Sequence, residues 1–269
     1  MKSTLVRTHR RRRTLGAMDG DHGRPHVVLI GGYLTEPLNY RRVRRRLLDR
    51  GAGTVTIAPL HVPDWLGAAI VGFGPALMRA GRTIRAARRA AGVPLIVVGH
   101  SGGGVVARLA MSAVPLDGRC AAVADDVACL VTLGTPHALG AHHRIGQHRG
   151  LDAIRFLDEH TPGAWFAPRT AYLSVGSSRV RPDATARRGP AGRVRHGLIR
   201  WILGDRPESG SDGLVPGASA HLDGARQVTF PDVLHGHIGG PWYGDTAIID
   251  RWWPIAVELW RGALEARRV

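Results

Sequence analysis

The stretch "PLIVVGHSGGGVVARLAMSAV" occupies residues 94–114 and joins an apolar run to a helical pattern through a cluster of glycines around one serine. The apolar run 94–100 predicts a buried strand, and residues 103–114 predict a helix packed by small side chains. A serine between glycines at such a junction is held on a tight strand-to-helix turn, with its hydroxyl above the sheet. The stretch therefore predicts an α/β fold that presents Ser101 as a candidate nucleophile.

Short apolar runs alternate with helical patterns on both sides of this stretch. The runs that predict strands lie at residues 26–32, 54–59, 94–100, 126–136, 170–177 and 225–230. The patterns that predict helices lie at residues 41–50, 75–91, 103–114 and 245–265. Because the strands are apolar throughout and are separated by helices, we expect a mostly parallel sheet with helices on both faces.

The length of 269 residues and the hydrophobic content of 44% are sufficient for one large core, so we expect one domain over residues 25–265. Residues 1–24 are basic and lack the apolar run of a signal peptide; we expect a disordered basic arm, or a start site assigned too far upstream. Two stretches break the alternation, a predicted cap or lid at about 138–168 and an irregular insertion at about 179–211. Long insertions of this kind are commonly lids or functional loops.

The formal net charge is +16, and Lys2 is the only lysine, so nearly all of the positive charge is arginine. The arginines are scattered, whereas a dedicated nucleic-acid binder concentrates its charge on one face. In the densest run, residues 41–50, the apolar side chains Val43, Leu47 and Leu48 recur at helical spacing, which predicts a helix with a solvated arginine face. We therefore expect no specific nucleic-acid partner.

Cys120 and Cys129 are the only cysteines, too few for a disulfide-stapled secreted scaffold. We expect both to be reduced thiols in the core, and the protein to be cytoplasmic. No apolar stretch reaches the ~20 residues that a membrane-spanning helix needs, so we expect no transmembrane segment. Peripheral contact with a lipid surface is compatible with this composition.

The glycines around Ser101 form a G-x-S-x-G pattern, in which Gly99 and Gly103 leave room for the turn on either side of His100 and the serine. The helix that follows offers unpaired backbone N–H groups and a partial positive charge, which suit a tetrahedral oxyanion. The N–H of Gly102 is the first such donor. A glycine-rich phosphate loop is the alternative, but no Lys-Ser or Lys-Thr pair follows as in a P-loop.

Three further motifs accompany this pattern: LIGGY after the first predicted strand, VTLGTPH at 131–137, and SDGLVP at 211–216 with a histidine-bearing segment behind it. Together the motifs resemble the α/β-hydrolase superfamily, and within it the bacterial triacylglycerol lipase and esterase branch, over about residues 25–260. The resemblance implies an α/β-hydrolase fold and a serine hydrolase that cleaves carboxylic esters, small-molecule or lipid, without a cofactor.

The same resemblance places a second oxyanion donor at the backbone N–H of Tyr33. Lipases of this branch commonly carry His-Gly before that residue, whereas this chain has Gly31-Gly32. The departure removes a side chain and leaves the backbone donor. A simple strand-ending turn is the alternative interpretation of Gly-Gly at this point.

A serine hydroxyl is unreactive at neutral pH unless an imidazole accepts its proton and a carboxylate orients that imidazole. In the resembled family the acid and then the histidine follow the serine along the chain. Asp212 matches the acid; Asp183 is the alternative, because Asp212 comes late after the preceding predicted strand. His235 matches the base, since it precedes a WYG sequence as in related chains, and His237 is the alternative.

The histidine-rich segment 137–148 lacks regular ligand spacing and a nearby thiolate or carboxylate, so we expect no metal. The apolar side chains within the predicted cap are expected to line an acyl pocket. The sequence thus predicts ester hydrolysis through an acyl-enzyme intermediate. Acyl transfer to an alcohol and a non-catalytic binding protein on the same fold are the alternatives.

Overall fold

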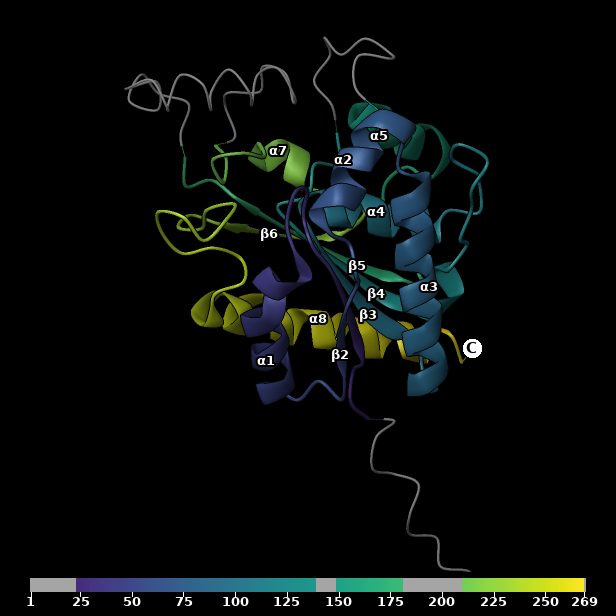
Figure 1. Cartoon of the computed structure of the whole chain (residues 1–269). Helices are drawn as coiled ribbons and strands as arrows, with labels where there is room; N and C mark the ends of the chain where they lie inside the picture. The colour runs from purple at the N-terminus through teal and green to yellow at the C-terminus, as the bar shows by residue number, and fades with distance from the viewer. Residues whose placement is uncertain (1–22, 139–148, 181–209, 269) are drawn as a thin grey trace, which may run out of the picture.

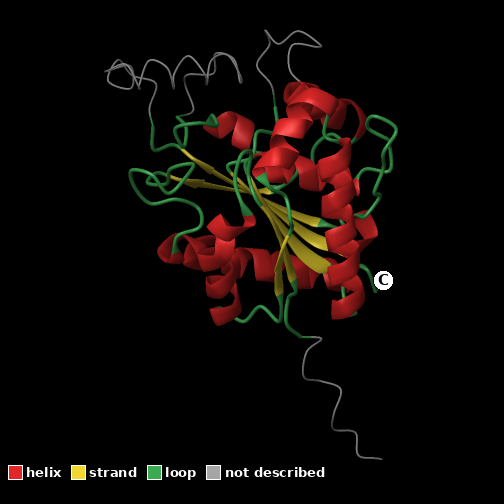
Figure 2. Cartoon of the chain, in the orientation of Figure 1, coloured by secondary structure: helices red, strands yellow, loops and turns green. Residues whose placement is uncertain are grey.

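The computed structural model describes residues 23–138, 149–180 and 210–268. Nearly all of the expected arm at 1–24, the histidine-rich part of the predicted cap and most of the insertion 179–211 lie outside the described residues. The expected domain boundaries therefore stay predictions. In the part that is described, one sheet carries helices on both faces, as Figures 1 and 2 show.

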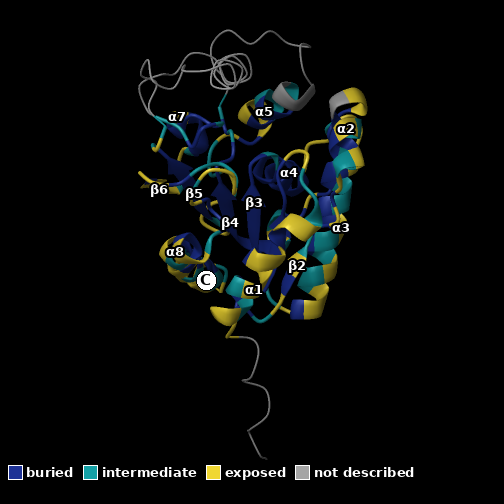
Figure 3. Ribbon diagram, turned by 60° about the vertical axis from the view of Figure 1, so that its left-hand side comes forward, coloured by how far each residue is buried: buried dark blue, intermediate teal, exposed yellow. Residues whose placement is uncertain are grey.

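Six strands build the sheet, and each lies within a run that the sequence predicts as a strand. They are β1 Val27–Ile30, β2 Val55–Ile57, β3 Leu95–His100, β4 Val127–Leu133, β5 Ala171–Ser177 and β6 Arg226–Phe230. All pair in parallel, in the spatial order β2-β1-β3-β4-β5-β6. Strands β1, β3 and β4 are buried along their whole length, because both faces are covered (Figure 3).

The helices divide between the two faces of the sheet. One face is covered by α1 (Arg41–Asp49) and α8 (Thr246–Ala266), and the other by α3 (Gly74–Ala91) and α4 (Gly102–Met111). The shorter elements are η1 Pro37–Tyr40, α2 Val62–Val71, η2 Ala124–Asp126, α5 Arg149–His160 and α7 Gly217–Ala220. Helix α2 packs against α5 beyond the carboxyl ends of the strands (Figure 1).

Helix α1 has the amphipathic character that its sequence predicts. Val43 and Leu47 are buried against the sheet, and most of its arginines are exposed. Arg46 and Arg50 both form ion pairs with Asp250 on α8. Hydrogen bonds from these two arginines lower the pKa of the Asp250 carboxyl to about 2. The pairs tie α1 to α8 on one face of the sheet.

Three helices differ from the sequence-based expectation: α2, α5 and the four-residue α7 are not among the predicted helices. The sequence does not predict helix α2, because apolar residues surround Pro63 and Gly67 without a clear polar face. Helix α5 lies inside the predicted cap 138–168, so that stretch is not irregular where it is described. Its buried side chains Ala153, Ile154 and Leu157 follow helical spacing.

The two cysteines have different surroundings. Cys129 is a buried free thiol in β4, as expected, and burial raises the pKa of its thiol. Cys120 is also free but only partly buried, so the expectation of a core position is wrong for this residue. The loop before η2 leaves its side chain at the surface. Among the described helices, none combines the length and the apolar character needed to cross a bilayer.

Two helical glycines allow a matched test of the close packing of α4. A Cβ on Gly104 would overlap the Thr135 side chain, whereas a Cβ on Gly262 in α8 would contact nothing within 4 Å. We expect Gly104→Ala to lower the free energy of unfolding by about 1–3 kcal/mol through overpacking. Gly262→Ala should raise it by up to about 1 kcal/mol through helix propensity. Urea denaturation of both variants measures these changes, and equal effects would contradict the tight α4 contact.

Candidate active site

Ser101 is the single residue between the end of β3 and the start of α4. Its backbone has φ 54° and ψ −130°, a region that is costly for a residue with a Cβ. Its N–H donates to the Leu133 carbonyl at 2.9 Å, and its own carbonyl accepts from Gly104 N–H at 3.0 Å. The turn therefore holds the serine side chain at the carboxyl end of the central strands.

The glycines of this turn are required by close approach. A Cβ on Gly99 would overlap the backbone of Gly104, and a Cβ on Gly103 would overlap the carbonyls that end β1. Gly32 lies against the serine from the neighbouring loop, where an added Cβ would be 2.9 Å from the Ser101 Cβ. The sequence pattern thus has the physical basis expected for it.

His235 links the serine to a carboxylate. Its Nε2 is 2.9 Å from Ser101 Oγ, and its Nδ1 is 2.8 Å from Asp212 Oδ2. Because a carboxylate only accepts, Nδ1 carries the proton, and Nε2 is left to accept from the serine hydroxyl. The side chain of His235 is 15% exposed and that of Asp212 is 1% exposed. The structure thus brings together three residues that are far apart in the sequence.

Asp212 is a buried carboxylate with several donors. Its Oδ1 accepts from the N–H groups of Leu214 and Val215 at 2.9 and 2.7 Å. Burial alone raises the pKa of the Asp212 carboxyl, but the His235 charge, its hydrogen bond and the two backbone donors outweigh that effect and leave the pKa below its ordinary value. The His235 N–H also donates to the Asp212 carbonyl at 2.9 Å. Acid and histidine are therefore joined through side chain and backbone.

Tyr243 is a further partner of the acid that sequence reasoning missed. Its hydroxyl donates to Asp212 Oδ2 at 3.0 Å, and the side chain is fully buried. Burial and the neighbouring carboxylate raise the pKa of this phenol. A Cβ on Gly134 would lie 2.6 Å from Asp212 Oδ2 and 2.7 Å from the Tyr243 ring. The WYG and LGTPH sequences were the available signals for these contacts.

The two expected oxyanion donors lie side by side. A Cβ placed on Gly102 would be 3.5 Å from the Tyr33 nitrogen. Gly102 is the first residue of α4, so its N–H has no acceptor within the helix. Neither of the two N–H groups has an acceptor among the described residues. The phenol ring of Tyr33 turns to the Trp65 ring at a centroid distance of 5.6 Å.

The alternative residues are not part of this arrangement. His237 is exposed, and its ring contacts Trp242 at a centroid distance of 6.2 Å. Asp183 lies outside the described residues. His137, the first residue of the histidine-rich segment, is buried, with its ring nitrogens near Arg108 and Thr132. Residues 23–138, 149–180 and 210–268 contain no group of three side chains suited to hold a metal ion.

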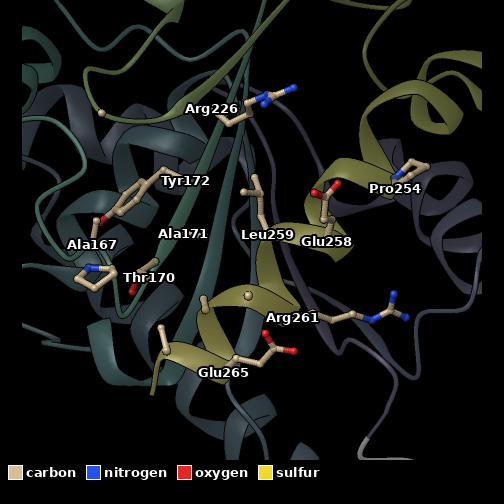
Figure 4. Close-up of a pocket in the computed structure, with 15 residues that line it drawn as sticks. Ala167, Thr170, Ala171, Tyr172, Arg226, Pro254, Glu258, Leu259, Arg261 and Glu265 are labelled. Carbon is tan, nitrogen blue, oxygen red and sulfur yellow. The ribbon is translucent and has the colours of Figure 1, made fainter. Parts of the chain in front are cut away.

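A groove of about 710 Å³ lies at the opposite end of the sheet. Figure 4 shows Leu259 and Glu258 of α8 across from Ala171 at the start of β5. Ligands in parallel sheets bind beyond the carboxyl ends of the strands, where Ser101 is found, whereas this groove is at the amino ends. The candidate site is therefore the Ser101 side of the sheet.

Comparison with known proteins supports the architecture. The model of a family described as the PGAP1-like alpha/beta domain matches residues 79–147. The lipase BlEst2 of Bacillus licheniformis, in mature form, superposes with a TM-score of 0.53 and 15% identity, covering 88% of this chain and 92% of that one. Phospholipase PlaB from Legionella pneumophila superposes with a TM-score of 0.56 and 14% identity, covering 88% of this chain.

The chain has the α/β-hydrolase fold. It spans 59% of the length of the phospholipase chain. None of the curated proteins matches this sequence significantly. The expectation of this fold from the elbow and its accompanying motifs is confirmed, and within the fold Ser101 occupies the turn between β3 and α4.

The Tyr243 hydroxyl gives a pH-dependent test of the acid. In Tyr243→Phe, Asp212 Oδ2 loses its second donor and is left to interact with His235, which favours the protonated imidazole. The acid limb of the pH–activity profile should therefore move to higher pH by about 0.3–1 unit, with a several-fold loss of kcat. Tyr172→Phe removes a buried hydroxyl far from the serine and serves as the control. An unmoved or lowered limb in Tyr243→Phe would show that its hydrogen bond does not act on the acid–histidine pair.

Proposed function

We propose that this protein is a serine hydrolase that cleaves carboxylic esters through an acyl-enzyme intermediate. The observation that carries the proposal is the continuous hydrogen-bonded line from Ser101 Oγ through the His235 ring to Asp212, with links of 2.9 and 2.8 Å. Nucleophile, base and orienting carboxylate stand in the order that acyl transfer requires. The α/β-hydrolase fold and its hydrolase relatives support a hydrolytic reaction.

In the first half of the reaction Ser101 Oγ attacks the ester carbonyl and passes its proton to His235 Nε2. Asp212 stabilises the imidazolium that forms. The carbonyl oxygen becomes an oxyanion, which accepts hydrogen bonds from the N–H groups of Tyr33 and Gly102. When the C–O bond breaks, the alcohol leaves with the proton from His235, and the acyl group stays on the serine.

In the second half water takes the place of the alcohol. His235 accepts a proton from the water, whose oxygen attacks the acyl-enzyme carbonyl. The same oxyanion donors stabilise the second tetrahedral intermediate, and collapse returns the proton to Ser101 Oγ. The products are one carboxylic acid and one alcohol for each water consumed.

Apolar side chains near the reacting groups favour esters with a lipid-like acyl group. The side chains of Tyr33, whose N–H is a proposed oxyanion donor, and of the adjoining Leu34 are exposed, and Ile238, three residues after the base, is 84% exposed. Water-exposed apolar side chains around a polar centre suit a substrate that covers them. The two similar structures are a lipase and a phospholipase, which is consistent with this substrate class.

Ser101→Ala tests the reaction type. We expect turnover of short p-nitrophenyl esters to fall at least ~10³-fold, because the nucleophile is lost while the fold remains. Product analysis of the wild type in water and with an added alcohol separates hydrolysis from acyl transfer. Circular dichroism verifies that the variant is folded. Near-normal turnover by a folded Ser101→Ala protein would contradict the proposal that the protein is a serine hydrolase.

The two histidines provide an internal control for the base. His235→Ala should lose as much activity as the serine variant, and Asp212→Asn should lose much of it because the imidazole is left in the wrong tautomer. His237→Ala should keep most of the activity, since that side chain is exposed and has no contact with the serine. The losses should not add in double variants, because the three groups act as one unit. An inactive His237→Ala protein with active His235→Ala would move the base by two residues.

A further inference from the structure

His100 is a buried histidine that the proposed reaction does not use. It precedes the nucleophile, and its ring centroid is 5.0 Å from that of His235. Its Nε2 is 2.9 Å from the carbonyl oxygen of His235, and its Nδ1 is 2.8 Å from the hydroxyl of Tyr40. The Tyr40 oxygen in turn accepts the N–H of Gly32 at 2.7 Å. These contacts connect the loops of Gly32 and His235 through η1 and the end of β3.

The direction of each hydrogen bond follows from the chemistry of the partners. A carbonyl oxygen only accepts, so His100 Nε2 must carry a proton. Burial, together with the positive charge of a protonated His235, lowers the pKa of His100 to about 3, so its ring is neutral and Nδ1 is an acceptor. Burial raises the pKa of the Tyr40 phenol, so its O–H is present to donate to Nδ1. One arrangement of protons satisfies every group in this hydrogen-bonded line, which runs from the Gly32 N–H through the Tyr40 hydroxyl and the His100 ring to the His235 carbonyl.

The line joins the two halves of the catalytic arrangement. Gly32 directly precedes the oxyanion donor Tyr33, so its N–H fixes the loop that carries that donor. At the other end the His235 carbonyl belongs to the residue that takes the serine proton. The Tyr40 ring reaches this position because residue 31 is glycine: a Cβ there would be 2.6 Å from the ring. Tyr40 itself is buried and directly precedes α1.

We propose that Tyr40 and His100 are positioning residues that hold the oxyanion loop and the catalytic-histidine loop in fixed relation, so that both engage the tetrahedral intermediate together. The inference rests on the proposed ester hydrolysis. His100 also has to stay uncharged, because a second positive ring 5.0 Å from His235 would oppose the imidazolium that forms in the reaction. The Tyr40 hydroxyl favours the neutral ring of His100, because its O–H donates to the Nδ1 lone pair that protonation would remove.

Tyr40→Phe removes the hydroxyl and keeps the ring. We expect kcat for a p-nitrophenyl ester to fall about 10-fold, with KM changed less than about twofold, because the lost interaction positions groups that act in the transition state. Affinity for phenylboronic acid, which forms a tetrahedral adduct with the serine, should fall by the same factor as kcat. The acid limb of the pH profile should stay in place, unlike that of Tyr243→Phe. Tyr172→Phe, the matched buried tyrosine, should leave kcat, KM, the boronic acid affinity and the acid limb unchanged.

Two substitutions of His100 separate its two contacts. His100→Asn places an acceptor near the Nδ1 position, and His100→Gln places a donor near Nε2. Each should retain one contact and lose activity partially. The combined loss in the Tyr40→Phe, His100→Gln double variant should be smaller than the sum of the single losses, since both changes remove the same O–H to Nδ1 bond. If Tyr40→Phe does not fold, His100→Gln removes the same Tyr40–His100 hydrogen bond from the His100 side, and we expect the same loss of kcat from it.

Hydrogen exchange of the Gly32 amide gives a readout that needs no activity. It should be protected in the wild type and exchange at least ~10-fold faster in Tyr40→Phe, since its acceptor is gone. An active wild type whose Tyr40→Phe variant keeps kcat and boronic acid affinity within twofold would overturn the positioning role and leave the hydrolase proposal standing. Unchanged Gly32 exchange would overturn the hydrogen-bonded line itself. A wild type that hydrolyses no ester would instead overturn the proposed function, together with the role that rests on it.

Discussion

The strained backbone at Ser101 is the constraint on which the rest of the site depends. A chain that leaves β3 and enters α4 through one residue with positive φ brings the residues two positions before and after it into close contact with backbone, and Gly99 and Gly103 have no side chain to prevent this. The strain is maintained by hydrogen bonds to β4 and to the first turn of α4. In return the hydroxyl is projected beyond the sheet, next to unpaired N–H groups of a helix amino end. Every other group in the site is placed relative to this hydroxyl.

Two buried tyrosines complete the polar surroundings of the site. Tyr243 donates to Asp212, and Tyr40 donates to His100, so each hydroxyl acts on a different partner of His235. Both phenols are held protonated by burial, which makes them dependable donors in a region of low dielectric. Such a set of fixed donors needs little rearrangement when charge develops in the reaction. The site therefore combines one strained turn with a largely preorganised set of hydrogen bonds.

The sequence predicted the sheet and the elbow well because both have strong local signals. Buried parallel strands are continuous apolar runs, and a serine among glycines between a strand and a helix is typical of a nucleophile elbow. Helix α2 could not be predicted because its apolar residues lack a polar face, whereas α5 was missed although Ala153, Ile154 and Leu157 follow helical spacing. The roles of Tyr40 and His100 could not be predicted either, since their contact joins positions 60 residues apart that share no motif. Asp212 and His235 were predicted from chain order and resemblance, and only the folded structure shows that their side chains lie 2.8 Å apart.

The most direct measurement of the central claim is covalent labelling of the wild-type protein with a fluorophosphonate, followed by peptide mapping. A serine activated by a neighbouring imidazole attacks such a reagent, whereas ordinary serines do not. We expect one adduct for each chain, on the peptide that contains Ser101. We also expect labelling to slow as the pH falls and the histidine becomes protonated. No adduct, or an adduct on a different residue, would contradict the assignment of Ser101 as an activated nucleophile.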